Sequence, residues 1–370
     1  MRMERYLIVI GTRPEAIKMC PLVLAMRAAG LGCRVVLTGQ HREMARGVLQ
    51  FFGVSADVDL DVMRAGQSLP VLTERLLGAV RRELARDADY TACLVHGDTA
   101  TAFAAALSCF YAGIPIVHVE AGLRSGDVRA PFPEEFYRRA VDAMSALWLA
   151  PTERAVGHLF AEGAVASRVY TVGNTATDAV RLCLEHKIEH PLLSELDGRR
   201  VVLLTAHRRE LDERSRYALL HAIRTRIEGR RDVLLVSPVH PSPCVRATVT
   251  AAFEDCANAR LTPPLPLPLM QQLLARASLL LTDSGGLQEE ATYLGIPTLV
   301  LRTRTERPEG VEAGVLATVG TDPWRVGEAV GALLADGARL ARMRRPSSVY
   351  GDGHVSERIV GILTERGRAL

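Results

Sequence analysis

One alternating pattern runs through the chain and limits its fold more than any other feature. Short runs rich in leucine and β-branched residues recur, and each is followed by turn residues and by a stretch with helical apolar spacing. This alternation is typical of strand–helix units that build a parallel sheet with helices on both faces. The pattern predicts strands at 6–10, 33–38, 92–95, 114–118, 147–149 and 169–171, and then at 201–204, 233–236, 278–282, 297–301 and 315–318.

The predicted strands fall into two groups, and the chain is long enough for two domains. Its 370 residues exceed the about 100–200 residues of a usual single domain. A polar, broken stretch at 190–198 separates the groups, so we expect the boundary within 172–198. We predict an N-terminal Rossmann-like domain over 1–172 and a C-terminal Rossmann-like domain over 173–354. A final helix over 355–370 is expected to pack back on the first domain.

Charge and cysteine usage exclude several classes of protein. The formal net charge is only +3, from 45 Lys and Arg against 42 Asp and Glu, so we expect neither nucleic acid nor a membrane surface as a partner. The seven cysteines are widely spaced and include no CxxC pair, so neither a disulfide framework nor a zinc site is predicted. No apolar run approaches the roughly 18 residues of a membrane-spanning helix. We expect a cytoplasmic protein.

The first candidate motif, Gly-Thr-Arg-Pro-Glu-Ala-Ile-Lys at 11–18, follows a predicted strand and opens a helix. In doubly wound domains ligands bind at the carboxyl ends of strands, and two such domains can face a central cleft. The turn offers backbone N–H groups to an anion, Arg13 adds a planar guanidinium, and Lys18 adds a compact charge. An ordinary turn with an exposed arginine would also fit. Neither GxGxxG nor GxxxxGK[ST] occurs, which argues against nicotinamide and P-loop nucleotide binding.

The second candidate motif is Thr-Asp-Ser-Gly-Gly-Leu-Gln-Glu-Glu at 282–290, again directly after a predicted strand. Its two glycines let a diphosphate approach the backbone, and Ser284 offers a hydroxyl. Glu290 lies one turn into the helix, where it can accept from ribose hydroxyls. Arg307, beyond the next strand, can approach the same phosphates. These features predict a nucleoside diphosphate site, while a plain tight turn would explain the glycines equally well.

Carboxylates and histidines follow other strands. Asp98 and Glu120 end strands that we expect to be neighbours, so the two carboxylates can shift each other's pKa in opposite directions, as acid–base catalysis requires. Asp98 can instead cap the next helix. His96 and His118 fit hydrogen-bonded strand histidines better than ligands. No HExxH or clustered Cys/His spacing occurs, so we predict no metal.

Taken together, the motifs resemble the non-hydrolysing UDP-N-acetylglucosamine 2-epimerases. Between residues 11 and 353 the chain carries, in family order, GTRPEAIKM, QHREM, VHGDT, HVEAGLRSGD, PFPEE, VGNT, HRRE, PVHP, TDSGGLQEE, TERPE and YGDG. The resemblance implies two Rossmann-type domains of the glycosyltransferase-B-like fold, a homodimer, and reversible conversion of UDP-GlcNAc to UDP-ManNAc without a cofactor. By position, it implies the catalytic residues Lys18, Asp98, Glu120, Glu134 and His207, and the substrate-binding residues Arg13, Arg138, His240, Ser284, Gly285, Gly286, Glu290 and Arg307.

The chain departs from the family pattern at two places. Phe136 and Tyr137 precede Arg138, where the family usually has a residue followed by Asn-Arg, and this change bears on the sugar substituents accepted. Before the helix predicted at 268–277, leucines and prolines replace the aromatic residue that the family tends to carry near the nucleobase. Some bacterial members also have an effector site for a second UDP-GlcNAc, to which Gln40 and Gln67 correspond.

The implied reaction restricts the mechanism, because no carbonyl group acidifies the C2–H bond of an N-acetylhexosamine. Expelling UDP from C1 gives that carbon oxocarbenium character, makes the C2 proton removable and leaves 2-acetamidoglucal, to which UDP adds back. The lack of a dinucleotide fingerprint argues against oxidation at C3. We therefore expect a UDP-sugar and UDP as partners. The alternatives are an epimerase for a modified UDP-hexosamine, a hydrolysing 2-epimerase, a glycosyltransferase of the same fold, or a non-catalytic sugar-nucleotide sensor.

Overall fold

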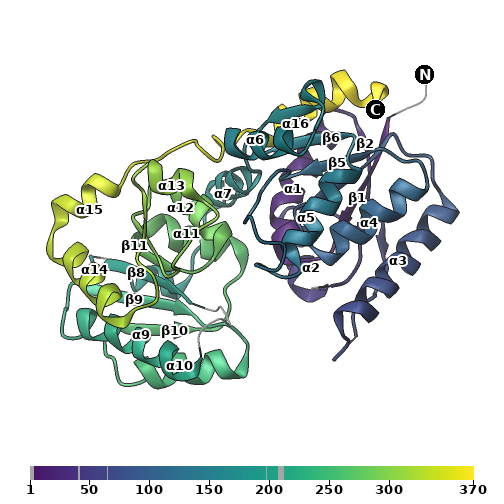
Figure 1. Cartoon of the computed structure of the whole chain (residues 1–370). Helices are drawn as coiled ribbons and strands as arrows, with labels where there is room; N and C mark the ends of the chain where they lie inside the picture. Colours follow the sequence, from purple (N-terminus) through teal and green to yellow (C-terminus); the bar gives the residue numbers. More distant parts are fainter. Residues whose placement is uncertain (1–3, 41, 65, 197, 207–211) are drawn as a thin grey trace. The chain divides into compact units, whose positions relative to one another are not determined.

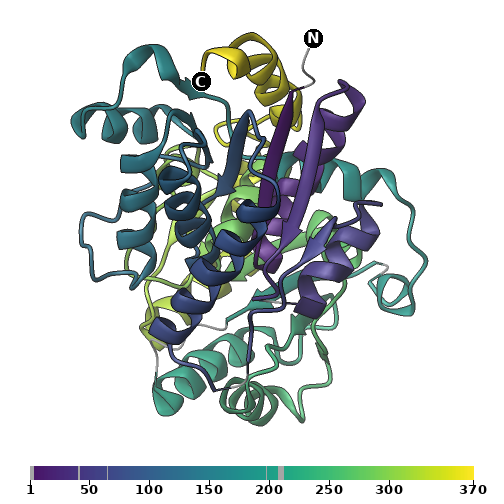
Figure 2. The same ribbon diagram turned by 90° about the vertical axis from the view of Figure 1, so that its right-hand side faces the viewer.

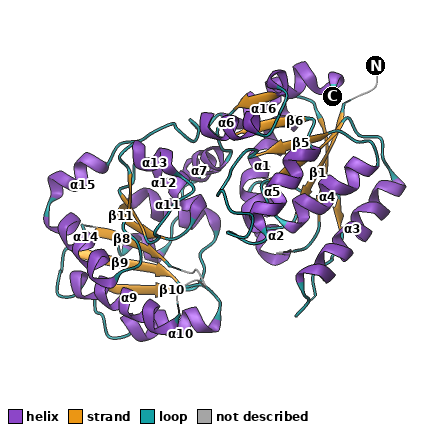
Figure 3. Cartoon of the chain, viewed as in Figure 1, coloured by secondary structure: helices purple, strands orange, loops and turns teal. Residues whose placement is uncertain are grey.

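Two parallel sheets, each with helices on both faces, form the centre of this computed structural model (Figure 3). The chain divides into two units (Figure 1): unit 1 is Met1–Ala179 with Tyr350–Leu370, and unit 2 is Val180–Val349. The two sheets confirm the predicted class of two doubly wound α/β domains. The structure describes residues 4–40, 42–64, 66–196, 198–206 and 212–370.

The sheet of unit 1 is built from β1 (Arg5–Ile10), β2 (Gly32–Leu37), β3 (Val58–Asp59), β4 (Ala92–His96), β5 (Ile116–Val119), β6 (Leu147–Ala150) and β7 (Val169–Thr171). Within the described residues the strand order is β3-β2-β1-β4-β5-β6-β7, and neighbouring strands are parallel. Burial on both faces explains the continuous apolar sequence of the central strands. The order reverses between β1 and β4, so their carboxyl ends border the crevice where such folds bind ligands.

The helices of unit 1 are α1 (Arg13–Ala28), α2 (Arg42–Phe51), α3 (Leu69–Arg86), α4 (Ala100–Tyr111), α5 (Glu134–Met144), α6 (Glu153–Ala161) and α16 (Val355–Arg366), with short 3₁₀ turns at Ala166–Arg168 and Gly367–Ala369. The chain passes into unit 2 within α7 (Ala176–Glu185). Helix α16 packs against α1, beside the N-terminal strand (Figure 2). The Asp178 carboxylate caps α16 by accepting from Val355 N at 3.0 Å and Ser356 N at 2.6 Å.

The sheet of unit 2 is built from β8 (Arg200–Thr205), β9 (Val233–Pro238), β10 (Ala259–Thr262), β11 (Ala277–Thr282), β12 (Thr298–Val300) and β13 (Leu316–Thr318). Its described strands have the order β10-β9-β8-β11-β12-β13, so the order reverses between β8 and β11. Alternate residues of β8 enter two cores, one on each face of the sheet. The helices are α8 (Pro191–Ser194), α9 (Glu213–Ile227), α10 (Pro243–Phe253), α11 (Leu267–Arg276), α12 (Gly285–Leu294), α13 (Pro308–Glu312), α14 (Pro323–Ala335) and α15 (Gly337–Met343).

Every strand that the sequence predicts is present, and the structure adds β3 and β10. Both additional strands lie at an edge of their sheet, and each pairs with a single neighbour. Their residues are mostly half-buried and include charged side chains, so they lack the apolar run that marks a central strand. Among the described helices, none combines the length and hydropathy of a membrane span.

Candidate functional site

The turn between β1 and α1 brings the backbone close to β2 and α4. A Cβ atom on Gly11 would lie 2.0 Å from Thr101 Oγ1, so the turn requires glycine here. Helix α1 begins with a capping box, in which Thr12 Oγ1 accepts from Glu15 N at 3.4 Å. The Glu15 carboxylate accepts in return from Gly11 N at 3.0 Å and Thr12 N at 2.6 Å.

This capping arrangement corrects one expectation about the turn. The N–H groups of Gly11 and Thr12 are not available to an anion, because Glu15 uses them. Glu15 is buried, and burial raises its pKa to about 7 although these hydrogen bonds and one from Thr99 Oγ1 at 2.7 Å lower it. Anion binding by this segment therefore depends on the side chains of Arg13, which is half-buried, and Lys18.

Lys18 and Glu120 form a buried ion pair in unit 1. Lys18 Nζ on α1 contacts Glu120 Oε2 directly after β5, and the two side chains are each only 9% exposed. Asn174 Nδ2, just before α7, donates to the same oxygen. The backbone of Glu120 has φ = 70°, a left-handed conformation that is rare for residues other than glycine. Strained backbone at this position therefore directs the carboxylate toward an ammonium and an amide.

The two strand histidines have different environments. His118 is hydrogen-bonded on both sides, with Nδ1 2.6 Å from Asp142 Oδ1 and Nε2 2.9 Å from Gly97 O, as the sequence predicts. His96 Nε2 is buried, lies 3.7 Å from Glu120 Oε2 and has no hydrogen-bond partner among the described residues. Burial lowers the pKa of His96 to about 3, although the Glu120 charge acts to raise it. His96 is therefore a neutral neighbour of the ion pair.

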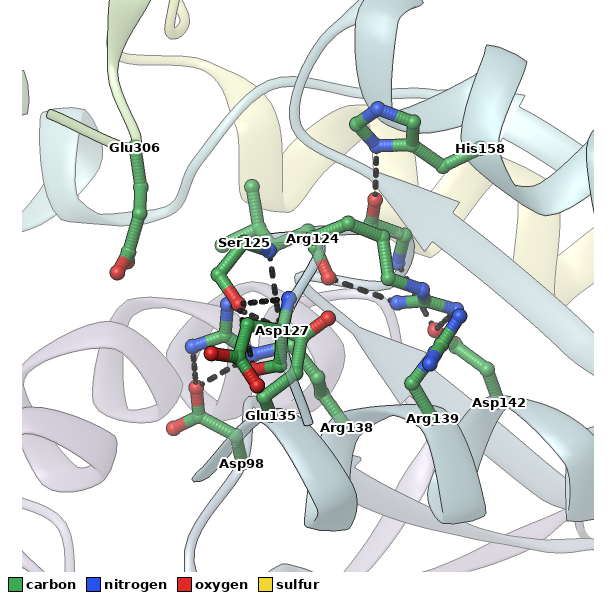
Figure 4. A network of polar contacts seen from close by, with 12 residues as sticks. Asp98, Arg124, Ser125, Asp127, Glu135, Arg138, Arg139, Asp142, His158 and Glu306 are labelled. Atoms are coloured by element: carbon green, nitrogen blue, oxygen red, sulfur yellow. Dashed lines mark hydrogen bonds and ion pairs between the residues drawn. The ribbon is translucent and has the colours of Figure 1, made fainter. Parts of the chain in front are cut away.

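Asp98 and Arg138 form the second carboxylate–cation pair of unit 1 (Figure 4). Arg138 on α5 is buried, and its Nε donates to Asp98 Oδ2 at 2.9 Å. The guanidinium also contacts the fully buried Glu135 at 3.3 Å. Thr99 caps α4, with Oγ1 accepting from Ala102 N at 3.0 Å, so the alternative role of Asp98 as the helix cap is wrong. Glu134 is half-buried at the first position of α5.

A polar network supports the loop that follows Glu120. Asp142 on α5 accepts from Gly122 N at 3.1 Å and pairs with Arg124 at 2.8 Å (Figure 4). Arg124 also pairs with Glu162 at 2.5 Å. These bonds connect β5, α5 and α6, and satisfied buried networks of this kind fix local geometry. The carboxylate of Glu120 thus projects from a rigid segment.

In unit 2, the turn after β11 has an arginine beside it. Ser284 is the N-cap residue of α12, whose first residue is Gly285. A Cβ on Gly285 would lie 3.1 Å from Arg307 Cζ, so the missing side chain lets the guanidinium approach the turn. Arg307 is held there by Glu289 Oε1 at 2.9 Å and Glu306 Oε2 at 3.0 Å. A helix N-terminus beside a fixed guanidinium suits a phosphate group.

Three of the remaining predicted residues of unit 2, Gly286, Glu290 and His240, lie within the described residues. Gly286 has open space where a Cβ would be. Glu290 is buried on α12 and accepts from Gln271 Nε2 on α11 at 2.8 Å. His240 follows β9, and its Nδ1 accepts from Ser242 N at 3.1 Å. His207 lies outside the described residues.

Several side chains of these clusters are absent from the sequence-based prediction of site residues, among them Asn174, Glu135 and Gln271. Asn174 and Glu135 belong to the VGNT and PFPEE motifs, so family-like motifs are the signal that points to them. Gln271 belongs to no such motif, and only the structure shows its contact with Glu290. Together the clusters define a doubly wound α/β protein with two carboxylate–cation pairs in unit 1 and a candidate phosphate site in unit 2.

Comparison with known proteins gives the family. The sequence profile of the UDP-N-acetylglucosamine 2-epimerase family matches residues 25–364. The UDP-N-acetylglucosamine 2-epimerase of Bacillus subtilis is 42% identical, with 97% of this chain and 95% of the relative covered. That of Escherichia coli K12 is 39% identical, with 97% and 98% covered. The chain belongs to the UDP-N-acetylglucosamine 2-epimerase family, which confirms the resemblance described above.

Solved structures agree with this assignment. The S. aureus MnaA–UDP co-structure superimposes with a TM-score of 0.93 at 39% identity, covering 99% of this chain and 98% of that one. UDP-GlcNAc 2-epimerase from Neisseria meningitidis bound to UDP-GlcNAc gives a TM-score of 0.91 at 36% identity, covering 98% and 100%. Acinetobacter baumannii MurG, at 13% identity and a TM-score of 0.59, shares the fold alone. The predicted glycosyltransferase-B-like fold is confirmed.

Proposed function

We propose that this chain interconverts UDP-GlcNAc and UDP-ManNAc without hydrolysis, by eliminating UDP to give 2-acetamidoglucal and adding it back. The observation that carries the proposal is the set of carboxylates in unit 1 that are each paired with a buried cation: Glu120 with Lys18, and Asp98 with Arg138. A glycosyltransferase or a sensor of this fold needs a nucleotide site but has no need of these groups. The similar Neisseria meningitidis UDP-GlcNAc 2-epimerase, which has UDP-GlcNAc bound, and the similar S. aureus MnaA, which has UDP bound, support the substrate class.

The first step breaks the C1–O bond, so negative charge develops on the departing diphosphate. In many enzymes, preorganised hydrogen-bond donors directed at such charge make the largest contribution to the rate enhancement. We assign this role in unit 2 to the turn at Ser284–Gly286 and to Arg307, whose guanidinium lies against Gly285. Arg13 and the predicted His207 complete the set. The electron pair of the C1–O bond leaves with UDP, and C1 gains oxocarbenium character.

The second step removes the C2 proton, and its electron pair forms the C1–C2 double bond of the glucal. We assign proton transfer to Asp98, Glu120 and Glu134, without distributing them between the two faces of the sugar. Their cationic partners hold two of these carboxylates in place, as preorganised general bases require. Return of a proton to the opposite face of C2, with UDP re-adding at C1, gives the epimer.

Incubation of UDP-GlcNAc with the purified protein alone, followed by separation of the products, tests this proposal. We expect UDP-ManNAc to accumulate to a constant ratio with UDP-GlcNAc, with no net release of free sugar. Free N-acetylmannosamine with UDP would identify a hydrolysing enzyme. Turnover only with an added acceptor would identify a transferase, and binding without turnover would identify a sensor. The same incubation is repeated with modified UDP-hexosamines. If one of them reacts much faster than UDP-GlcNAc, that modified sugar is the substrate.

We further propose a homodimer in the cytoplasm. Phe110 and Tyr111 on α4 and Phe136 on α5 are exposed aromatic residues on two helices that pack together. We take the homodimer from the family resemblance, and these exposed aromatic side chains are candidates for its interface. Light scattering after size-exclusion chromatography is expected to give twice the 40.3 kDa chain mass.

A further inference from the structure

A buried glutamine contacts the proposed nucleotide-binding helix. Gln271 on α11 is 1% exposed, and its Nε2 lies 2.8 Å from Glu290 Oε2 on α12. The amide nitrogen is the donor in this hydrogen bond and a carboxylate oxygen is the acceptor, so the nitrogen faces Glu290. The amide oxygen, Oε1, is then buried without a hydrogen-bond partner among the described residues.

The unpaired buried oxygen of Gln271 destabilises the fold relative to an apolar side chain at this position. Leu269, Leu273 and Leu274 of the same helix are buried in the apolar core of unit 2. A leucine or methionine would fill the position without burying an unsatisfied amide oxygen. Glutamine therefore fits this position if its amide is needed to hold the Glu290 carboxylate.

We propose that Gln271 is a positioning residue, which fixes the plane of the Glu290 carboxylate so that it accepts from both ribose hydroxyls of bound UDP. The inference rests on the proposed function, which places UDP at the N-terminal end of α12. Glu290 lies in the second turn of that helix, beyond the Ser284 turn that we assign to the diphosphate. Two hydroxyls on adjacent ribose carbons demand one orientation of the carboxylate, and fixing it in advance reduces the entropy lost on binding.

The adjacent residue provides a matched control. Gln272 is also buried, at 8% exposed, but its Nε2 donates to His186 O at 3.1 Å and its Oε1 accepts from Arg276 at 2.6 Å. Substitution of Gln272 therefore removes a buried amide from the same helix without touching Glu290. A general loosening of α11 would follow from either substitution, whereas loss of carboxylate orientation would follow only from Gln271.

Titration calorimetry with UDP and with 2′,3′-dideoxyuridine diphosphate tests the proposal. We expect Gln271→Met to weaken UDP binding about five- to tenfold, because the Glu290 carboxylate must then be ordered when UDP binds. Binding of the dideoxy nucleotide is expected to change less than about twofold, since it has no hydroxyls for Glu290. Gln271→His retains an N–H donor, so it is expected to keep most of the UDP affinity. Gln272→Met is expected to change neither affinity.

Equal weakening of both nucleotides by Gln271→Met would show a packing role and overturn the proposal. Unchanged UDP affinity in that variant, or a loss in Gln271→His as large as in Gln271→Met, would overturn it as well. The wild-type protein separates this inference from the proposed function. If it binds no UDP, the proposed function fails. If it binds UDP and the dideoxy nucleotide equally, only the role of Glu290, and with it that of Gln271, fails.

Discussion

The buried pair of Lys18 and Glu120 allows a quantitative test of how unit 1 is held together. Both side chains are 9% exposed, so removing one charge leaves the other buried without its counter-charge. Removal of one partner of such a pair typically costs about 3–5 kcal/mol. We expect Lys18→Met and Glu120→Gln each to destabilise unit 1 by about this amount. The double variant leaves no uncompensated charge, so it is expected to cost no more than one single variant, which is a coupling of at least about 3 kcal/mol.

Tryptophan fluorescence can isolate unit 1 in this experiment. The chain has two tryptophans: Trp148 is buried in β6 of unit 1, and Trp324 is 71% exposed in unit 2. In a Trp324→Phe background, urea unfolding followed by fluorescence reports the environment of Trp148 alone. The analysis then avoids assuming that both units unfold in one transition.

A surface pair of the same unit is the matched control for the cycle. Arg46 and Asp59 lie 2.5 Å apart, with side chains 51% and 21% exposed. The cycle of Arg46→Met and Asp59→Asn is expected to give a coupling of about 0–1 kcal/mol. If the Lys18 and Glu120 substitutions add to within about 0.5 kcal/mol, as independent sites do, our account of this pair is wrong.

Three further predictions concern unit 1. Lys18→Arg is expected to lose most turnover while the fold is kept, because the rigid guanidinium is larger than an ammonium in a buried site; near-normal turnover would return Lys18 to an ordinary structural role. Gly11→Ala is expected to destabilise unit 1 by about 1–3 kcal/mol, since its Cβ would overlap Thr101, and urea unfolding that matches wild type would contradict this. His96 has a pKa lowered from 6.5 to about 3 in the folded protein, so the unfolded chain binds a proton at this residue more readily. The free energy of unfolding therefore decreases as the pH drops below 6.5. Between about pH 6.5 and pH 5, wild type is expected to lose about 2 kcal/mol more than His96→Gln, and parallel pH profiles would refute the buried, neutral state of His96.

The sequence predicts the central strands well because these strands are buried on both faces. β1 and β8, for example, contain continuous apolar runs, which have few alternative interpretations. β3 and β10 escape prediction because an edge strand is stabilised by one neighbour and needs no apolar run. They are strands because they pair with β2 and β9, so their own sequences do not mark them.

Candidate site residues can be named from the sequence, but the residues that contact them cannot. Motifs that follow strands point to Lys18, Glu120 and Asp98, yet the ion pair of Lys18 joins residues that are 102 positions apart. The left-handed backbone conformation of Glu120 could not be predicted, because glutamate rarely adopts it. The hydrogen bonds of the Gly11 turn, in contrast, can be predicted from the sequence. The Thr-x-x-Glu pattern at 12–15 is a capping-box signal and indicates that Glu15 accepts from the N–H groups of the turn.

Hydrogen exchange at C2 tests the central claim most directly. UDP-GlcNAc is incubated with the protein in deuterated water until the two UDP-sugars reach a constant ratio, and the C2 position of each is examined by NMR. Elimination passes the C2 proton to a carboxylate that exchanges with solvent, so the account predicts deuterium at C2 of both UDP-GlcNAc and UDP-ManNAc. Epimerisation with the original C2 proton fully retained would contradict elimination of UDP and would require a different way of activating that carbon.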